Sequence, residues 1–108
     1  MLPLDAKEDD VTTIYTHTTW RVKPGMEEEF VQRWADWVEW SQPRGLADKA
    51  RLLRDIESAA TFVSFGPWAS IEAVRGWRAL PGYHERVARL REVVESFEPR
   101  TLELVSER

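Results

Sequence analysis

The sequence has no cysteine and no asparagine, and it has only two histidines and five glycines. Without cysteine there is no disulfide, no thiolate metal site and no cysteine nucleophile. The glycines are scattered without the G-x-G spacing of a phosphate-binding loop. Two histidines do not give a metal-ligand spacing, and no serine lies in a nucleophile elbow. We therefore expect a protein that needs no metal and no flavin or other cofactor.

Long apolar runs and an excess of basic residues are also missing. The 108 residues carry a net charge of −4, and no apolar run approaches the roughly 20 residues of a membrane span. No basic stripe with interleaved aromatics is present, so neither nucleic acid nor a membrane is expected as a partner. Residues 1–10 are acidic and lack the apolar centre of a signal peptide, which predicts a cytoplasmic protein. We expect a flexible tail over 1–10 and one domain over 11–108.

The first half of the domain reads as a strand followed by a helix. Residues 11–22 are rich in β-branched and aromatic residues and predict a strand with alternating faces. One face would carry Ile14, Thr16, Thr18, Trp20 and Val22. Glutamates at 27–29 suit the first turn of the helix that follows. Its apolar stripe would comprise Met26, Phe30, Val31, Trp34, Trp37 and Val38.

The second half predicts a hairpin, a broken helix and a last strand. Residues 50–57 and 61–68 would be strands joined by a turn at 58–60. Ser70 can begin a helix that Pro81 and Gly82 interrupt, with a second helical segment over 83–97 and a strand from 100 onward. The order β-α-β-β-α-β predicts an α+β, ferredoxin-like fold. Its four-stranded antiparallel sheet would carry both helices on one face.

The opposite face of this sheet is expected to be mixed in character. Apolar Tyr15, Leu53, Val63 and Val105 would lie there among His17, Arg21 and Glu103. Such a face suits a contact with a second copy better than open water, because monomers rarely expose large apolar patches. We therefore expect a homodimer through the exposed sheet face.

Several segments in this order resemble the antibiotic biosynthesis monooxygenase family. They are "VKPGMEEEF", the tryptophan-bearing helix, a hairpin that ends in "GPWAS", and "IEAVRGW", with the resemblance covering about residues 11–105. The resemblance implies a dimeric α/β barrel with a pocket between helices and sheet. It also implies a cofactor-independent monooxygenase for polyketides, a haem-degrading oxygenase, or a relative with another task.

A cofactor-free oxygenase must mainly bind, orient and desolvate its substrate. The broken helix and the first strand offer three candidate catalytic residues: His84 as general base, Trp77, and Thr18 at the position where haem-degrading relatives carry asparagine. The candidate substrate-binding residues are Thr16, Trp20, Trp34, Trp37, Trp68 and Tyr83. The same pattern also allows the tryptophans to be ordinary core residues and His84 to be solvated. If Trp77 lines a cavity, its truncation to alanine should cost only ~1–2 kcal/mol.

The sequence thus predicts a cofactor-independent monooxygenase, or a related activity such as cyclisation, for an aromatic or polyketide-like molecule. The first alternative is a non-catalytic ligand-binding or assembly protein on the same fold, since fold does not determine function. The second is a haem-degrading oxygenase. The sequence matches that alternative less closely, because Thr18 replaces asparagine and His84 lies nearer to Trp77 than the haem ligand does.

Overall fold

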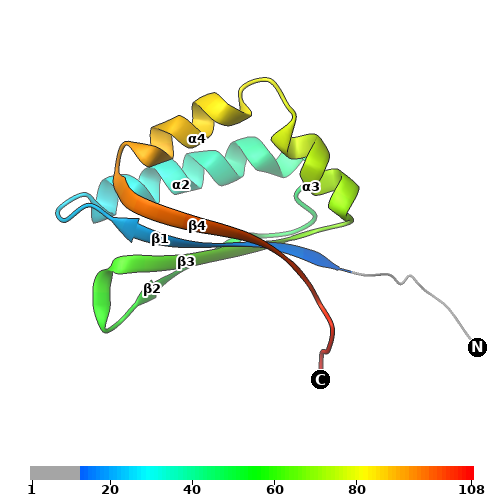
Figure 1. The fold of residues 1–108 in the computed structure, drawn as a ribbon, viewed down its shortest axis with the longest axis horizontal. Coiled ribbons are helices and arrows are strands. Elements are labelled where there is room, and N and C mark those ends of the chain that lie inside the picture. The colour runs from blue at the N-terminus through cyan, green and yellow to red at the C-terminus, as the bar shows by residue number, and fades with distance from the viewer. Residues whose placement is uncertain (1–12) are drawn as a thin grey trace, which may run out of the picture.

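The computed structural model describes residues 13–108, and it has two layers (Figure 1). A four-stranded antiparallel sheet in the order β2-β3-β1-β4 carries all the helices on one face. This confirms the predicted ferredoxin-like fold. The elements are β1 (Ile14–Val22), α2 (Glu27–Ser41), the short η1 (Gln42–Arg44), β2 (Arg51–Asp55), β3 (Ser58–Trp68), α3 (Ile71–Arg78), α4 (Tyr83–Arg91) and β4 (Val94–Glu103). The predicted tail over 1–10 lies outside the described residues.

Two predicted boundaries are wrong. The hairpin turns at 56–57 rather than 58–60, and the Asp55 carboxylate accepts a hydrogen bond from the Glu57 backbone N–H at 2.8 Å. The last helix ends at Arg91 rather than 97, because the buried Val94 begins β4 instead. Pro99 therefore lies within β4 and not after a helix. It is tolerated there because β4 is an edge strand.

The helix break comes from a glycine with a positive φ. Gly82 has φ of 92°, and α4 begins at the next residue. Ser70 caps α3 by accepting a hydrogen bond from the Ala73 N–H at 3.1 Å. Both signals are present in the sequence. They allow α3 and α4 to run in different directions over the same face of the sheet (Figure 1). The break therefore determines which side chains of the two helices face the sheet.

Two clusters of buried residues join the layers. One contains Trp20, Val22, Phe30, Phe62, Leu90, Val93 and Val94, and the other contains Trp68, Val74 and Trp77. The stripe of α2 contributes to both through Trp37. Val31 was predicted to belong to this stripe, but it is 38% exposed and lies in neither cluster. No helix in residues 13–108 is both long enough and apolar enough to cross a membrane.

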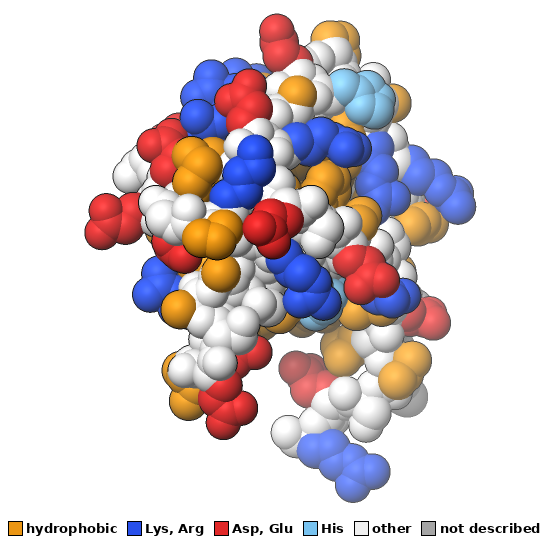
Figure 2. Space-filling view, turned by 60° about the vertical axis from the view of Figure 1, so that its left-hand side comes forward, with side chains coloured by type: hydrophobic (Ala, Val, Ile, Leu, Met, Phe, Trp, Pro, Cys, Tyr) orange, Lys and Arg blue, Asp and Glu red, His pale blue; other side chains and the backbone are white. Residues whose placement is uncertain are grey.

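Arg33 ties α2 to the end of α4. Its guanidinium donates to Glu29 at 2.9 Å, to the Glu92 carboxylate at 2.7 Å and to the Arg89 backbone oxygen at 2.6 Å. The hydrogen bond and charge of Arg33 lower the pKa of the Glu92 carboxyl. Charged side chains of both signs are interspersed over the surface that Figure 2 shows, so this face has no single-sign stripe.

Candidate functional site

A cavity of about 300 Å³ lies between the helices and the sheet, and residues from both buried clusters line it. Eight of the nine predicted site residues are on its wall. They are Thr16, Thr18, Trp20, Trp34, Trp37, Trp68, Trp77 and Tyr83. The alternation of β1 explains the first three, because Thr16, Thr18 and Trp20 share the face that the helices cover. The structure thus brings these residues together, while their roles remain proposals.

His84 is the exception. It is exposed, it is absent from the cavity wall, and its ring meets the edge of Tyr83 with centroids 5.4 Å apart. Successive residues of a helix are about 100° apart around its axis, so Tyr83 and His84 cannot both point inward. The helix start at Gly82 directs Tyr83 toward the sheet. We therefore assign no catalytic role to His84.

Three tryptophans of the wall are held by hydroxyl groups. The indole N–H of Trp20 donates to Ser64, that of Trp68 to Thr16, and that of Trp77 to Ser41, each at 2.9 Å. Such bonds satisfy buried indole donors and restrict how the rings can turn. Ser41 and Ser64 are buried, and sequence reasoning missed both because neither lies in a catalytic motif. One signal could have found them: a buried tryptophan needs a hydrogen-bond acceptor for its indole N–H group, and a serine hydroxyl can supply it.

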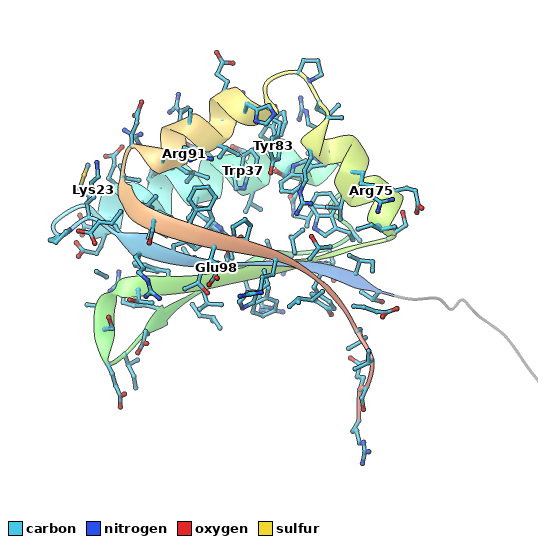
Figure 3. The ribbon with its side chains drawn as sticks, viewed as in Figure 1. Lys23, Trp37, Arg75, Tyr83, Arg91 and Glu98 are labelled. Carbon is cyan, nitrogen blue, oxygen red and sulfur yellow. The ribbon has the colours of Figure 1, made fainter. Side chains whose placement is uncertain are left out.

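Aromatic rings also support one another around the helix break. The Trp77 ring centroid lies 4.6 Å from that of Trp68, 5.0 Å from Tyr83 and 5.2 Å from Trp37. Trp37 and Tyr83 contact each other edge to face at 5.3 Å, and both lie between the helical layer and the sheet (Figure 3). This cluster forms a rigid aromatic wall from α2, β3, α3 and α4.

Ser41→Ala tests how much the wall depends on these hydroxyls. Ser41 accepts from Trp77 and donates to the Trp37 backbone oxygen at 2.8 Å. The substitution leaves a buried indole N–H without its acceptor, so we expect the free energy of unfolding to fall by about 1–3 kcal/mol in urea denaturation. Ser58→Ala on the exposed hairpin is the control and should change it by less than about 0.5 kcal/mol. Equal effects of the two substitutions would contradict the role of Ser41.

Few polar groups of the wall remain open to a ligand. Within residues 13–108, neither the Thr18 hydroxyl nor the Tyr83 hydroxyl has a hydrogen-bond partner, and no carboxylate or imidazole side chain belongs to the wall. Arg78 lies at the end of α3 and donates to Thr101 at 3.0 Å. The described chain also has no cluster of three or more potential histidine and carboxylate metal ligands. The wall is thus mainly apolar and aromatic, with hydroxyl groups and the two arginines Arg78 and Arg100 as its polar residues.

The cavity does not fit haem bound through a histidine. Of the two histidines, His84 is exposed outside the wall, and His17 belongs to the opposite face of the sheet. Thr18, which occupies the asparagine position of haem-degrading relatives, does line the cavity, as does Trp77. Neither histidine therefore lies where it could ligate a haem iron inside the cavity.

Comparisons with known proteins agree with this architecture. A family model described as antibiotic biosynthesis monooxygenase matches residues 13–89. A variant of SnoaB, a cofactor-independent oxygenase from Streptomyces nogalater, is similar in structure with a TM-score of 0.79 and 20% identity, covering 88% of this chain and 95% of that chain. A protein from Shewanella oneidensis is similar with a TM-score of 0.74 and 16% identity, covering 88% and 93%. A conserved protein from Methanosarcina mazei has a TM-score of 0.75 and 14% identity, covering 85% and 92%. No curated protein matches the sequence.

Proposed function

The chain belongs to the antibiotic biosynthesis monooxygenase family, and from that premise we propose that it is a cofactor-independent monooxygenase for an aromatic, polyketide-like molecule. The observation that carries the proposal is the cavity of about 300 Å³ whose wall holds five tryptophans and Tyr83. Flat aromatic walls stack on flat ligands and exclude water. The similarity in fold to a cofactor-independent oxygenase supports the same assignment.

The reaction needs no external electrons if the substrate supplies them. A ring methylene between two aromatic rings loses a proton to give a resonance-stabilised carbanion. The carbanion bonds to O₂, and return of the proton to the terminal oxygen gives a hydroperoxide. Loss of the second C–H proton then breaks the O–O bond, which leaves the new carbonyl and releases the other oxygen atom as water. The methylene gives up four electrons and O₂ takes up four, so the step balances. The protein's task is to orient the substrate, stabilise the anion and exclude water.

Tyr83 is the residue best placed to act on a proton in this cavity. It lies on the wall, and none of the side-chain hydrogen bonds among residues 13–108 involves its hydroxyl. A phenol can donate a hydrogen bond to a developing oxyanion or transfer a proton to the product. Thr18 supplies a second hydroxyl to the same space, which can bind but does not titrate. We propose that Tyr83 is the catalytic residue and that Thr18 helps to orient the substrate.

Oxygen consumption separates this function from the alternatives. An oxygen electrode with a dihydroxyanthrone as substrate should record uptake above the uncatalysed rate, with the corresponding anthraquinone as product. Saturable binding with no oxygen uptake and no product would instead support a ligand-binding protein. A rearranged product formed without oxygen would support a cyclase. The apolar, hydroxyl-bearing wall is compatible with either alternative, so the product decides between them.

We also propose that a second copy of the chain covers the face of the sheet that the helices leave open. A groove of about 350 Å³ runs over this face, lined by Tyr15, His17, Phe65, Leu102, Leu104 and Val105, among others. Leu102 is 43% exposed, and the His17 Nδ1 is buried without a partner among the described residues. The groove thus combines exposed apolar surface with a polar atom that lacks a hydrogen bond. A second chain could cover the apolar surface and supply a hydrogen-bonding group to His17.

Leu102→Glu tests this interface. The wild-type protein should have twice the 12.6 kDa chain mass in light scattering at micromolar concentration, and the variant should have the monomer mass, because a buried carboxylate without a partner opposes association. Ile56→Glu is the control, since Ile56 is 95% exposed at the hairpin turn outside the groove, and it should remain a dimer. A monomeric wild type would exclude the proposed interface.

A further inference from the structure

We infer that Arg78 makes the cavity selective for aromatic molecules that carry an anionic oxygen, an inference that rests on the proposed aromatic-binding function. Of the described residues that line the wall, Arg78 and Arg100 have positively charged side chains and none has a negatively charged one. The face of the molecule that Figure 2 shows differs from this wall, because charged side chains of both signs occur on it. The direction of each guanidinium decides which of the two arginines could contact a ligand in the cavity.

The Arg100 guanidinium is directed away from the cavity. In the register of β1 with β4, Arg100 lies opposite His17, and Glu98 lies opposite Thr19, so both belong to the sheet face away from the helices. The Arg100 guanidinium donates to the Glu98 carboxylate at 3.1 Å. Figure 3 shows Glu98 on that far side of the sheet. Arg100 is thus paired outside the cavity, and among the described residues Arg78 is the cation of the wall that remains.

Arg78 is half-buried and held in place by a neutral group. It is the last residue of α3, and its guanidinium donates to the Thr101 hydroxyl of β4 at 3.0 Å. Thr101 lies opposite Thr16, which is on the helix-facing side of β1. The guanidinium therefore reaches from the helical layer to the sheet at the edge of the cavity. Within residues 13–108, no carboxylate lies close enough to Arg78 for an ion pair.

This arrangement orients a positive charge without neutralising it. A guanidinium has five N–H donors, and the bond to Thr101 uses one of them. A partly buried charge gains most from a partner of opposite sign, and a guanidinium matches a carboxylate or an ionised phenol through short, charge-assisted hydrogen bonds. The ring system of the ligand would contact the neighbouring Trp68 and Trp77, which also lie on the wall. The ligand class is therefore a planar aromatic acid.

The test compares ligands that share one ring system. Naphthoate, a nitronaphthol that is ionised at pH 7, and neutral naphthamide are titrated into the wild-type protein by calorimetry. We expect the two anions to bind about 10- to 100-fold more tightly than the amide, the range of one charge-assisted hydrogen-bonded pair. Arg78→Met should remove this preference and leave naphthamide affinity unchanged, and Arg78→Lys should keep part of it. The tighter of the two anions identifies a carboxylate or a phenolate as the preferred group.

Arg75→Met is the matched control. Arg75 lies one turn earlier on α3, and its side chain points away from the cavity (Figure 3). The Arg75→Met variant should therefore bind all three ligands as tightly as the wild type does. Thermal unfolding of each variant confirms that it is folded. If all three compounds bind the wild type equally and Arg78→Met changes nothing, the inference fails and the proposed aromatic binding stands. If none binds at millimolar concentration, both fail.

Discussion

Trp77→Ala is expected to lower the free energy of unfolding by about 3–5 kcal/mol, the usual cost of truncating a large buried ring. Trp77 is only 7% exposed, and its ring packs on Trp68, Trp37 and Tyr83. Its indole N–H also donates to the buried Ser41. The variant loses these contacts together and leaves Ser41 without its donor, which makes this the largest stability effect that we predict.

The same substitution should also remove binding of an aromatic ligand, because Trp77 is part of the cavity wall. Trp77→Phe keeps a ring and should cost less stability while still weakening binding. Trp40→Ala is the control: Trp40 stacks on Trp37 at 5.5 Å but does not line the cavity. Denaturation midpoints and calorimetric affinities of the three variants are compared. Unchanged affinity in folded Trp77→Phe and Trp77→Ala would show that the ring only fills the core.

Tyr83→Phe is expected to lower kcat by about 100-fold or more while substrate affinity and stability stay close to the wild type, because proton transfer by a positioned group contributes ~10²–10⁴-fold. The change removes one oxygen atom and keeps the ring that contacts Trp37 and Trp77. Tyr83 is one of only two tyrosines in the chain. A loss in kcat without a loss in binding would therefore identify the hydroxyl itself as catalytic.

Tyr15→Phe is the matched control for this experiment. Tyr15 lies in the groove on the far face of the sheet and not on the cavity wall. The Tyr15→Phe substitution should therefore leave kcat unchanged. Full activity in Tyr83→Phe, or an equal loss in both variants, would contradict the role of Tyr83. A parallel Thr18→Val variant should raise KM more than it lowers kcat, because the threonine hydroxyl orients the substrate rather than transferring a proton.

Much of the site follows from simple periodicity. The alternation of β1 correctly placed Thr16, Thr18 and Trp20 beneath the helices, and the proline and glycine at 81–82 correctly placed the helix break. These features depend on local geometry, which the sequence carries directly. Trp77 at the end of α3 and Tyr83 at the start of α4 then meet because the chain turns between them.

The features that the sequence could not place are those that only packing decides. The helix predicted to reach 97 ends at Arg91, because pairing with β1 takes residues from Val94 onward into the sheet. The predicted loss of only ~1–2 kcal/mol for Trp77→Ala assumed a ring with few protein contacts, whereas the ring is packed on several sides and also reaches the cavity, so we now expect the larger loss. His84 was the favoured base because histidine is the commonest general base, but it lies outside the wall. Chemical suitability alone could not distinguish it from Tyr83.

The origin of the oxygen in the product decides whether the protein is an oxygenase. A dihydroxyanthrone is incubated with the protein under ¹⁸O₂ in the presence of a chelator and without reductant, and the product is analysed by mass spectrometry. We expect an anthraquinone with one labelled carbonyl oxygen, formed faster than in the uncatalysed reaction and faster than with Tyr83→Phe. An unlabelled product, or bound anthrone that is not oxidised above the uncatalysed rate, would contradict this expectation.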